Sequence, residues 1–160
     1  MASKWYNNAL NLLLKGDLDM DSGCKLVLVT SSYSFDAADD YLDMGDSGDV
    51  SSLEAGVAST LTNYTAGFGG AGRKTVVTTV TLDDSLPGAH VSLADTTWTA
   101  LGGAANNTLG GVVVCKEDTN DAASPLIAFL DFTDTATNGS DITLDFNASG
   151  ADGNLRLTAT

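Results

Sequence analysis

The stretch LGGVVVCKEDTNDAASPLIAFLDF, residues 109–132, decides the fold of this chain. It contains two apolar runs, Leu109–Lys116 and Pro125–Phe132, separated by a polar loop. Runs of this length that are rich in Val, Ile and Phe are typical of buried strands, and a polar loop between two of them predicts a β-hairpin. Pro125 opens the second run, where its missing N–H does least harm to strand pairing. The sequence therefore predicts a pair of buried antiparallel strands.

Further strand-like runs lie on both sides of this hairpin. The nearly continuous apolarity of CKLVLVT (Cys24–Thr30) predicts a central strand covered on both faces. The Val- and Thr-rich run KTVVTTVTL (Lys74–Leu82) predicts another strand. Shorter candidates follow at 89–93, 96–101, 142–146 and 154–159. Together these runs predict a mainly β protein, an antiparallel β-sandwich or barrel of about 8–9 short strands.

The N-terminal residues 3–15, SKWYNNALNLLLK, have the spacing of a short amphipathic helix. Ser3 is expected to cap its start and Gly16 to end it. Because a helix of this length is marginal on its own, its apolar stripe must dock either on its own domain or on a neighbouring subunit. We therefore divide the chain into an N-terminal helix or arm, residues 1–16, and a single β-sandwich domain, residues 17–160.

The segment between the first two predicted strands is irregular. Residues 36–44 have a spacing compatible with short helical turns, and residues 53–62 are weakly patterned and could hold an edge strand. The glycines of YTAGFGGAG, residues 64–72, predict a turn or a bulged crossover with positive φ. A phosphate-binding loop is the alternative for this stretch. It is disfavoured because Arg73 stands where that motif needs lysine, and because the following residues favour a strand.

The composition excludes several classes of function. The chain has 160 residues, of which 21 are acidic and 7 basic, and its formal net charge is −14. Such a charge repels nucleic-acid phosphates and anionic membrane surfaces. No apolar run approaches the ~18 residues of a membrane span, and nothing resembles a signal peptide. We therefore expect a soluble protein made in the cytoplasm, with neither nucleic acid nor membrane as a partner.

Asp17, Asp19 and Asp21 form the pattern that most suggests a metal site. Alternating acids followed by a glycine are found in calcium-binding loops. The twelfth position of such a loop needs a bidentate glutamate, however, and here it is Leu28, while the glycine comes one place late. We favour solvated acids and keep a calcium site at these three aspartates as the alternative. A second acidic group is expected to be solvated surface and comprises Asp39, Asp40, Asp43, Asp46 and Asp49.

No catalytic apparatus is expected. His90 is the single histidine, and no Gly-x-Ser-x-Gly elbow accompanies it, so a Ser–His–Asp device is not indicated. Cys24 and Cys115 are interpreted as buried free thiols, with a disulfide between them left open. Two cysteines and one histidine at these spacings fit no zinc motif. We expect a protein that is not an enzyme, with no catalytic residue, no cofactor and no cofactor-binding residue.

Several short motifs recur in a recognisable order along the chain. After the helix and an acidic segment comes KLVLVTSSYSFD (Lys25–Asp36), followed by YTAGFGG (Tyr64–Gly70), a segment around Trp98, and SPLIAFLDF (Ser124–Phe132). This order resembles a family of small virion structural proteins of tailed bacteriophages. The chain departs from the family where Phe35 replaces a usual proline and in residues 37–60 and 102–107, which match no motif.

The resemblance implies a bacteriophage virion structural protein without catalytic residues. The leading expectation is a capsid decoration (cement) protein that binds the outer surface of the head and stabilises contacts between capsid subunits. Its partners would be the major capsid protein or other virion proteins, and a homo-oligomer, dimer or trimer, is expected. Its location would be the virion, assembled in the host cytoplasm.

A cement protein would bind through apolar surface and β-edge contacts, with the N-terminal helix and residues 37–60 touching its neighbours. The alternative is a tail, baseplate or fibre accessory module that binds the host surface or another tail protein. In a sugar-binding version of that module, Trp98, Tyr33 or Tyr64 would stack on the ligand.

Overall fold

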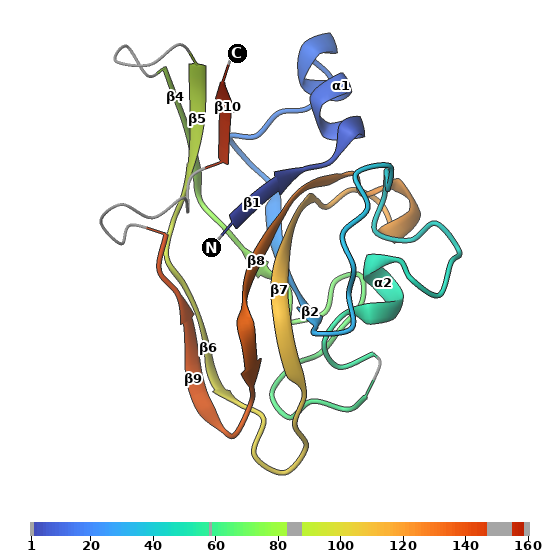
Figure 1. The fold of residues 1–160 in the computed structure, drawn as a ribbon, viewed down its shortest axis with the longest axis vertical. Helices are drawn as coiled ribbons and strands as arrows, with labels where there is room; N and C mark the ends of the chain where they lie inside the picture. The colour runs from blue at the N-terminus through green and yellow to red at the C-terminus, as the bar shows by residue number, and fades with distance from the viewer. Residues whose placement is uncertain (1, 58, 83–87, 147–154, 159–160) are drawn as a thin grey trace.

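The computed structural model describes residues 2–57, 59–82, 88–146 and 155–158. Its strands form three antiparallel sheets (Figure 1). The five-stranded main sheet has the order β1-β8-β7-β2-β3 and consists of β1 (Ala2–Trp5), β8 (Leu126–Ala136), β7 (Thr108–Lys116), β2 (Cys24–Thr30) and β3 (Lys74–Thr75). The prediction of a mainly β antiparallel protein with a short N-terminal helix is confirmed. The described sheets do not close into a barrel.

Two smaller sheets lie on one side of the main sheet, at the left of Figure 1. One has the order β10-β5-β4 and consists of β10 (Leu155–Thr158), β5 (Gly88–Leu93) and β4 (Thr78–Leu82). The other pairs β6 (Thr96–Leu101) with β9 (Ser140–Leu144). The opposite side of the main sheet is covered by α2 (Val50–Leu53) and the irregular segment that precedes it. The main sheet is therefore the middle of three layers.

The central strands of the main sheet are buried on both faces. In β2, Leu26 and Leu28 pack into the core cluster that contains Trp98, while Val27 and Val29 pack into a second cluster on the other face. All four of these β2 side chains are fully buried. Covering on both faces explains why the run has little polar alternation. The predicted central strand is confirmed.

The predicted hairpin of residues 109–132 is also confirmed. β7 pairs with β8 in a register that sets Val112 opposite Leu130 and Val114 opposite Ala128. The polar loop between them contains a 3-10 turn, Asp121–Ala123. This turn places the carboxylate of Asp121 at one end of the main sheet.

The N-terminus begins as a strand, so the predicted helix start at Ser3 is wrong. β1 pairs with the edge of β8, with Ser3 opposite Leu130. Helix α1 (Asn7–Lys15) starts only after Tyr6 and ends, as predicted, at Gly16, whose φ is 79°. The helical spacing of residues 3–6 was misleading because the edge of β8 offers them backbone hydrogen bonds.

The predicted strand Lys74–Leu82 is divided between two sheets. The Val76 N–H donates to the carbonyl of Cys24 at 3.1 Å, whereas the carbonyl of Val77 accepts from the N–H of Ala94 at 3.0 Å. The backbone therefore leaves β2 and joins β5 at this point, which carries the chain from the main sheet into the three-stranded one. β-propensity does not reveal such an exchange because both halves remain extended.

Other local predictions have mixed outcomes. Residues 36–44 form turns and a single bridge between Tyr41 and Pro125, so the predicted helical turns are wrong. The described part of residues 53–62 contains one bridge, from Val29 to Glu54, in place of the predicted edge strand. The predicted loop at 147–153 lies outside the described residues. No helix in the described chain combines the length and apolarity needed to cross a bilayer.

Candidate functional site

Two of the most heavily buried charged side chains in the described chain, Glu54 and Arg73, meet at the two ends of the segment that links α2 to β3. Glu54 is fully buried and Arg73 is 4% exposed. The Arg73 guanidinium donates to Glu54 from Nη2 at 2.6 Å and from Nε at 3.0 Å. It also donates to both carboxylate oxygens of Asp121, from Nη1 at 2.5 Å and from Nη2 at 2.9 Å. One guanidinium thus binds two carboxylates in the forked geometry that favours arginine.

The remaining hydrogen-bonding capacity of Glu54 is also used. Its Oε1 accepts from the Tyr64 hydroxyl at 3.1 Å, and its Oε2 accepts from the Gly67 N–H at 3.1 Å. Burial, reinforced by the Glu54 carboxylate, raises the pKa of Tyr64 well above its usual value and keeps the hydroxyl protonated. The same hydroxyl accepts from the Leu28 N–H of β2 at 3.3 Å. We call Glu54, Tyr64, Arg73 and Asp121 the ion-pair cluster.

The ion-pair cluster joins two parts of the chain. Glu54 and Tyr64 belong to the segment before β3, Arg73 ends that segment, and Asp121 lies in the turn between β7 and β8. Burial alone would lower the pKa of the Arg73 guanidinium. The hydrogen bonds from Arg73 to Asp121 and Glu54 raise that pKa instead, so the guanidinium stays charged. Chemically the cluster is closed, because the carboxylate oxygens of Glu54 and Asp121 already accept hydrogen bonds from donors within the protein. Its role is to fix residues 54–73 against the main sheet.

The glycines of residues 64–72 are explained by close packing around this cluster. A Cβ on Gly72 would lie 2.6 Å from the Tyr64 ring, and one on Gly70 would lie 2.3 Å from the carbonyl oxygen of Thr65. Gly67 has a φ of 84°, so the predicted positive-φ turn is confirmed. The Gly72 carbonyl also accepts from the Trp98 indole at 2.7 Å. The segment is a packed structural turn, and Arg73 points into the protein.

Replacing Gly72 with alanine should lower the free energy of unfolding by about 1–3 kcal/mol, because the added methyl group collides with the Tyr64 ring. Denaturant titration of the two proteins would measure the difference. Gly48→Ala is the matched control, since a Cβ there meets no atom within 4 Å. An equal loss in both variants would show that the contact with Tyr64 is not the cause.

The three aspartates of the candidate calcium pattern do not converge on a metal position. Instead, Lys116 Nζ donates to the carbonyl of Asp19 at 2.8 Å and to that of Ser22 at 2.5 Å. The Asp19 carboxylate accepts from the Asp21 N–H and from the Ser22 hydroxyl, and these hydrogen bonds lower its pKa. The lysine ammonium thus takes the place of a cation at this turn. No group of three or more acidic, His or Cys side chains in the described chain could hold a metal ion.

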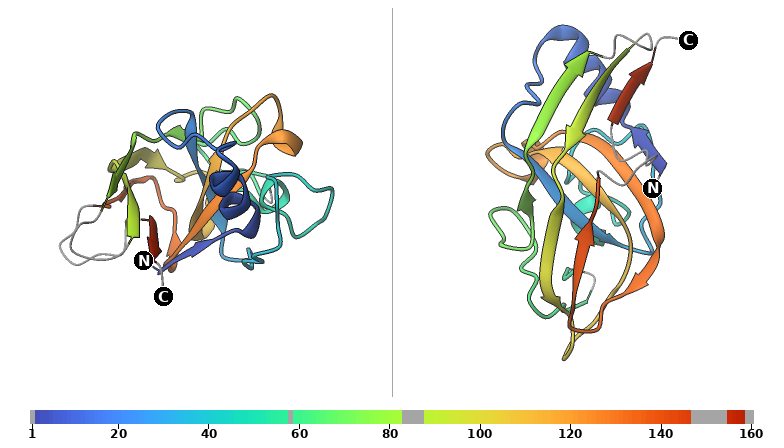
Figure 2. Two further views of the ribbon diagram at one scale, coloured as in Figure 1. Left: turned by 90° about the horizontal axis from the view of Figure 1, so that it is seen from above. Right: turned by 90° about the vertical axis from the view of Figure 1, so that its left-hand side faces the viewer.

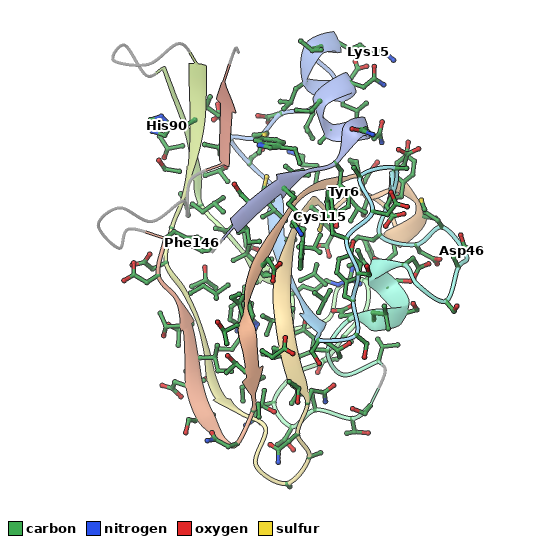
Figure 3. The ribbon with its side chains drawn as sticks, viewed as in Figure 1. Tyr6, Lys15, Asp46, His90, Cys115 and Phe146 are labelled. Carbon is green, nitrogen blue, oxygen red and sulfur yellow. The ribbon has the colours of Figure 1, made fainter. Side chains whose placement is uncertain are left out.

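Three residues of the second acidic group, Asp39, Asp46 and Asp49, line a cleft of about 410 Å³ beside α2. Its floor includes Phe35 and Leu53, and Asp39 and Asp46 are among the carboxylates around it. Burial and the neighbouring aspartates raise the pKa of Asp39. Figure 3 shows Asp46 on the exposed loop at the right of the molecule. No basic residue is among the residues that line this cleft, so it presents an acidic face to solvent.

Asp49 has a different role from the other aspartates of this group. It is 4% exposed, so the prediction that it is solvated surface is wrong. Its side chain caps α2 by accepting from the Ser52 N–H at 2.8 Å, and it also accepts from the Met44 N–H at 3.2 Å. Burial alone would raise its pKa, but these hydrogen bonds lower it. Asp49 therefore shapes the wall of the cleft.

The aromatic residues proposed for sugar stacking are inside the protein. Trp98, Tyr64 and Tyr33 are 1%, 6% and 9% exposed, so none offers a free ring face to a ligand. The Tyr33 hydroxyl lies 2.5 Å from that of Tyr6, and Trp98 binds the Gly72 carbonyl. The stacking role assigned to these three residues is therefore wrong. The residues next to these three in the sequence do not show whether each aromatic ring is half-buried on a strand or lies inside the core.

The two cysteines and the histidine occupy separate positions in the structure. Cys24 and Cys115 are free and fully buried, and they belong to the core clusters on opposite faces of the main sheet. The predicted free thiols are confirmed, and the alternative of a disulfide is excluded. His90 lies on β5, and its side chain points away from the body of the molecule in Figure 3.

The ion-pair cluster was missed by the sequence analysis, although the sequence holds one signal of it. The chain contains only two glutamates among its 21 acidic residues, and both lie beside Arg73. Glu117 Oε1 is 4.0 Å from Arg73 Nη1, at the rim of the cluster. Because nearly all acidic residues of this chain are aspartates, the two glutamates indicate that their surroundings differ from the rest of the acidic surface.

Comparisons of this chain with models of protein families, with curated proteins and with solved structures gave no match. The function must therefore be inferred from the residues of the chain and their arrangement.

Proposed function

We propose that this chain is a bacteriophage virion structural protein, a capsid decoration protein that binds the outer surface of the head and stabilises contacts between capsid subunits. The observation that carries the proposal is the ion-pair cluster, in which the buried charges of Glu54 and Arg73, together with Asp121, hold a loop segment in place. A fixed loop segment loses little conformational entropy when it binds, which favours a stable contact with a protein partner.

The distribution of charge supports a position on the outside of a particle. The chain carries a formal charge of −14, and the acidic cleft presents several carboxylates to solvent. Packaged DNA would repel such a surface, whereas the outer face of a shell would not bring it near phosphates. The order of motifs along the sequence, which resembles that of small tailed-phage virion proteins, supports the same assignment.

Binding would be multivalent and would use preformed surfaces. Symmetry-related sites on a capsid repeat many times, so a modest affinity at each site gives high occupancy when neighbouring copies also touch one another. The partner is the major capsid protein or another virion protein, and the protein acts as a dimer or trimer. The irregular segment of residues 31–73 supplies much of the contact surface.

The proposal is tested by adding the purified protein to phage particles that lack it. We expect many copies distributed over the head, seen by electron microscopy, and a higher temperature of DNA release from decorated particles. Arg73→Met should reduce the occupancy, because it frees the segment that the cluster holds.

The same particles distinguish the tail alternative. A few copies located at the tail or baseplate, with no effect on head stability, would contradict the capsid assignment and favour an accessory tail module.

A further inference from the structure

The edge of the three-stranded sheet is the least protected strand edge in the described chain. Among the described strands, β4 pairs with β5 alone, and the order β10-β5-β4 leaves the other side of β4 without a described strand. Figure 2 shows β4 at the margin of this sheet. Exposed backbone N–H and C=O groups on an edge strand are a template for pairing with another strand.

The hydrogen bonds around β4 identify which residues face the open side. The carbonyl of Val77 accepts from Ala94 on the β5 side, whereas the N–H of Val76 donates toward β2 on the other side. Successive residues of a strand direct their backbone N–H and C=O groups to opposite sides of the strand. The backbone groups of Val80 and Leu82 therefore point away from β5. The Thr78 hydroxyl donates to the carbonyl of Met20, so the chain at Met20 lies beside the first residue of β4.

Other edge strands carry the devices that proteins use against unwanted pairing, and β4 carries none. β1 ends the main sheet with Lys4, β9 contains Asp141, and β6 is interrupted by a register shift after Trp98. β3 has only two residues. By contrast, β4 has the sequence TTVTL, with no charge, no proline and no bulge in its pairing with β5.

Apolar exposure supports the same reading of β4. Val80 is 50% exposed at the middle of the strand, and Val77, just before it, is 69% exposed. A partner strand placed along the edge would cover part of Val80 and satisfy the outward-facing backbone groups. Threonine and valine are also the residue types that form favourable cross-strand pairs.

We infer that β4 pairs antiparallel with β4 of a second copy of this chain, about a two-fold axis at Val80. In this register Val80 lies opposite Val80 of the second copy, and Thr79 lies opposite Thr81. No charged residue opposes another within the strand. This favours β4 as a contact in a chain with a formal charge of −14, because the net charge opposes the association of two copies. The result is a continuous six-stranded sheet made of two three-stranded ones.

The inference goes beyond capsid binding and is tested on the purified protein. Sedimentation from micromolar to millimolar concentration should show a monomer–dimer equilibrium that strengthens with salt, since salt screens the net repulsion. Val80→Lys should weaken dimerisation at least about tenfold, because two ammonium groups would face each other. Val57→Lys is the matched control, since Val57 is also 50% exposed but lies outside the sheet, and it should leave the dimer unchanged.

A cysteine at the same position provides a second readout that does not depend on the lysine variant. Under mild oxidation Val80→Cys should form a covalent dimer, whereas Val57→Cys should form much less of one, and Cys24 and Cys115 are too buried to interfere. A protein that stays monomeric at millimolar concentration, an unchanged dimer in Val80→Lys, or equal cross-linking at both positions would overturn the inference. Failure here would leave capsid binding untouched, because that is measured on particles.

Discussion

Replacing Arg73 with methionine should lower the free energy of unfolding by about 3–5 kcal/mol, since it strands the buried carboxylate of Glu54 without its cation. Methionine fills much of the volume of the arginine stem, so the loss comes mainly from charge and hydrogen bonding. Asp121 is less buried and loses a partner that it can partly replace with water. Chemical denaturation followed by circular dichroism gives the difference directly.

An exposed ion pair provides the control for this prediction. Lys4 lies 3.7 Å from Asp131, and their side chains are 44% and 49% exposed. Lys4→Met should change the free energy of unfolding by less than about 1 kcal/mol, because surface ion pairs contribute little. If Arg73→Met were as mild as Lys4→Met, the cluster would not be what holds residues 54–73 in place.

A double variant that removes the charges of both Arg73 and Glu54 separates the cost of leaving the Glu54 carboxylate unpaired from the loss of the ion pair itself. Combining Arg73→Met with Glu54→Gln should recover part of the stability lost in Arg73→Met alone, because no buried charge is then left without a partner. A double variant that is less stable than the single one would contradict the explanation by stranded charge.

The sequence predicted the central framework because the signal there is local. The apolar runs of β2, β7 and β8 are long and rich in β-branched residues, and burial on both faces leaves little else they could form. The turn at Gly67 was likewise visible, since clustered glycines mark positive φ. These features need no knowledge of distant contacts.

The failures lie where partners distant in sequence decide the structure. Residues 3–5 became a strand because β8 had a free edge, and Lys74–Leu82 was divided because its two halves meet different strands. The ion-pair cluster joins Arg73 to residues 19 and 48 positions away. No local pattern encodes such a meeting, although the rarity of glutamate in this acidic chain gave a hint of its place.

Removal of the N-terminal residues should also lower the free energy of unfolding by a large amount. Deleting residues 1–16 should lower the free energy of unfolding by about 5 kcal/mol or more, a large part of the stability of an ordinary domain. The deletion removes Tyr6 and Ala9, which are fully buried, and it uncovers the edge of β8 that β1 protects. It also leaves the Tyr33 hydroxyl without the Tyr6 partner that lies 2.5 Å away.

Thermal unfolding distinguishes a segment that belongs to the core of its own subunit from an arm that only contacts a neighbouring subunit. If residues 1–16 only reached out to a neighbour, the shortened chain would keep its Tm, and only its binding to other subunits would suffer. Point variants locate the effect within the segment: Tyr6→Phe should lower the free energy of unfolding by about 1–2 kcal/mol through the hydroxyl pair alone. Leu14→Ala should have almost no effect, since Leu14 is 90% exposed. Because Tyr6 and Ala9 lie inside the core, we expect the N-terminus to act first on the stability of its own subunit and only through that on assembly.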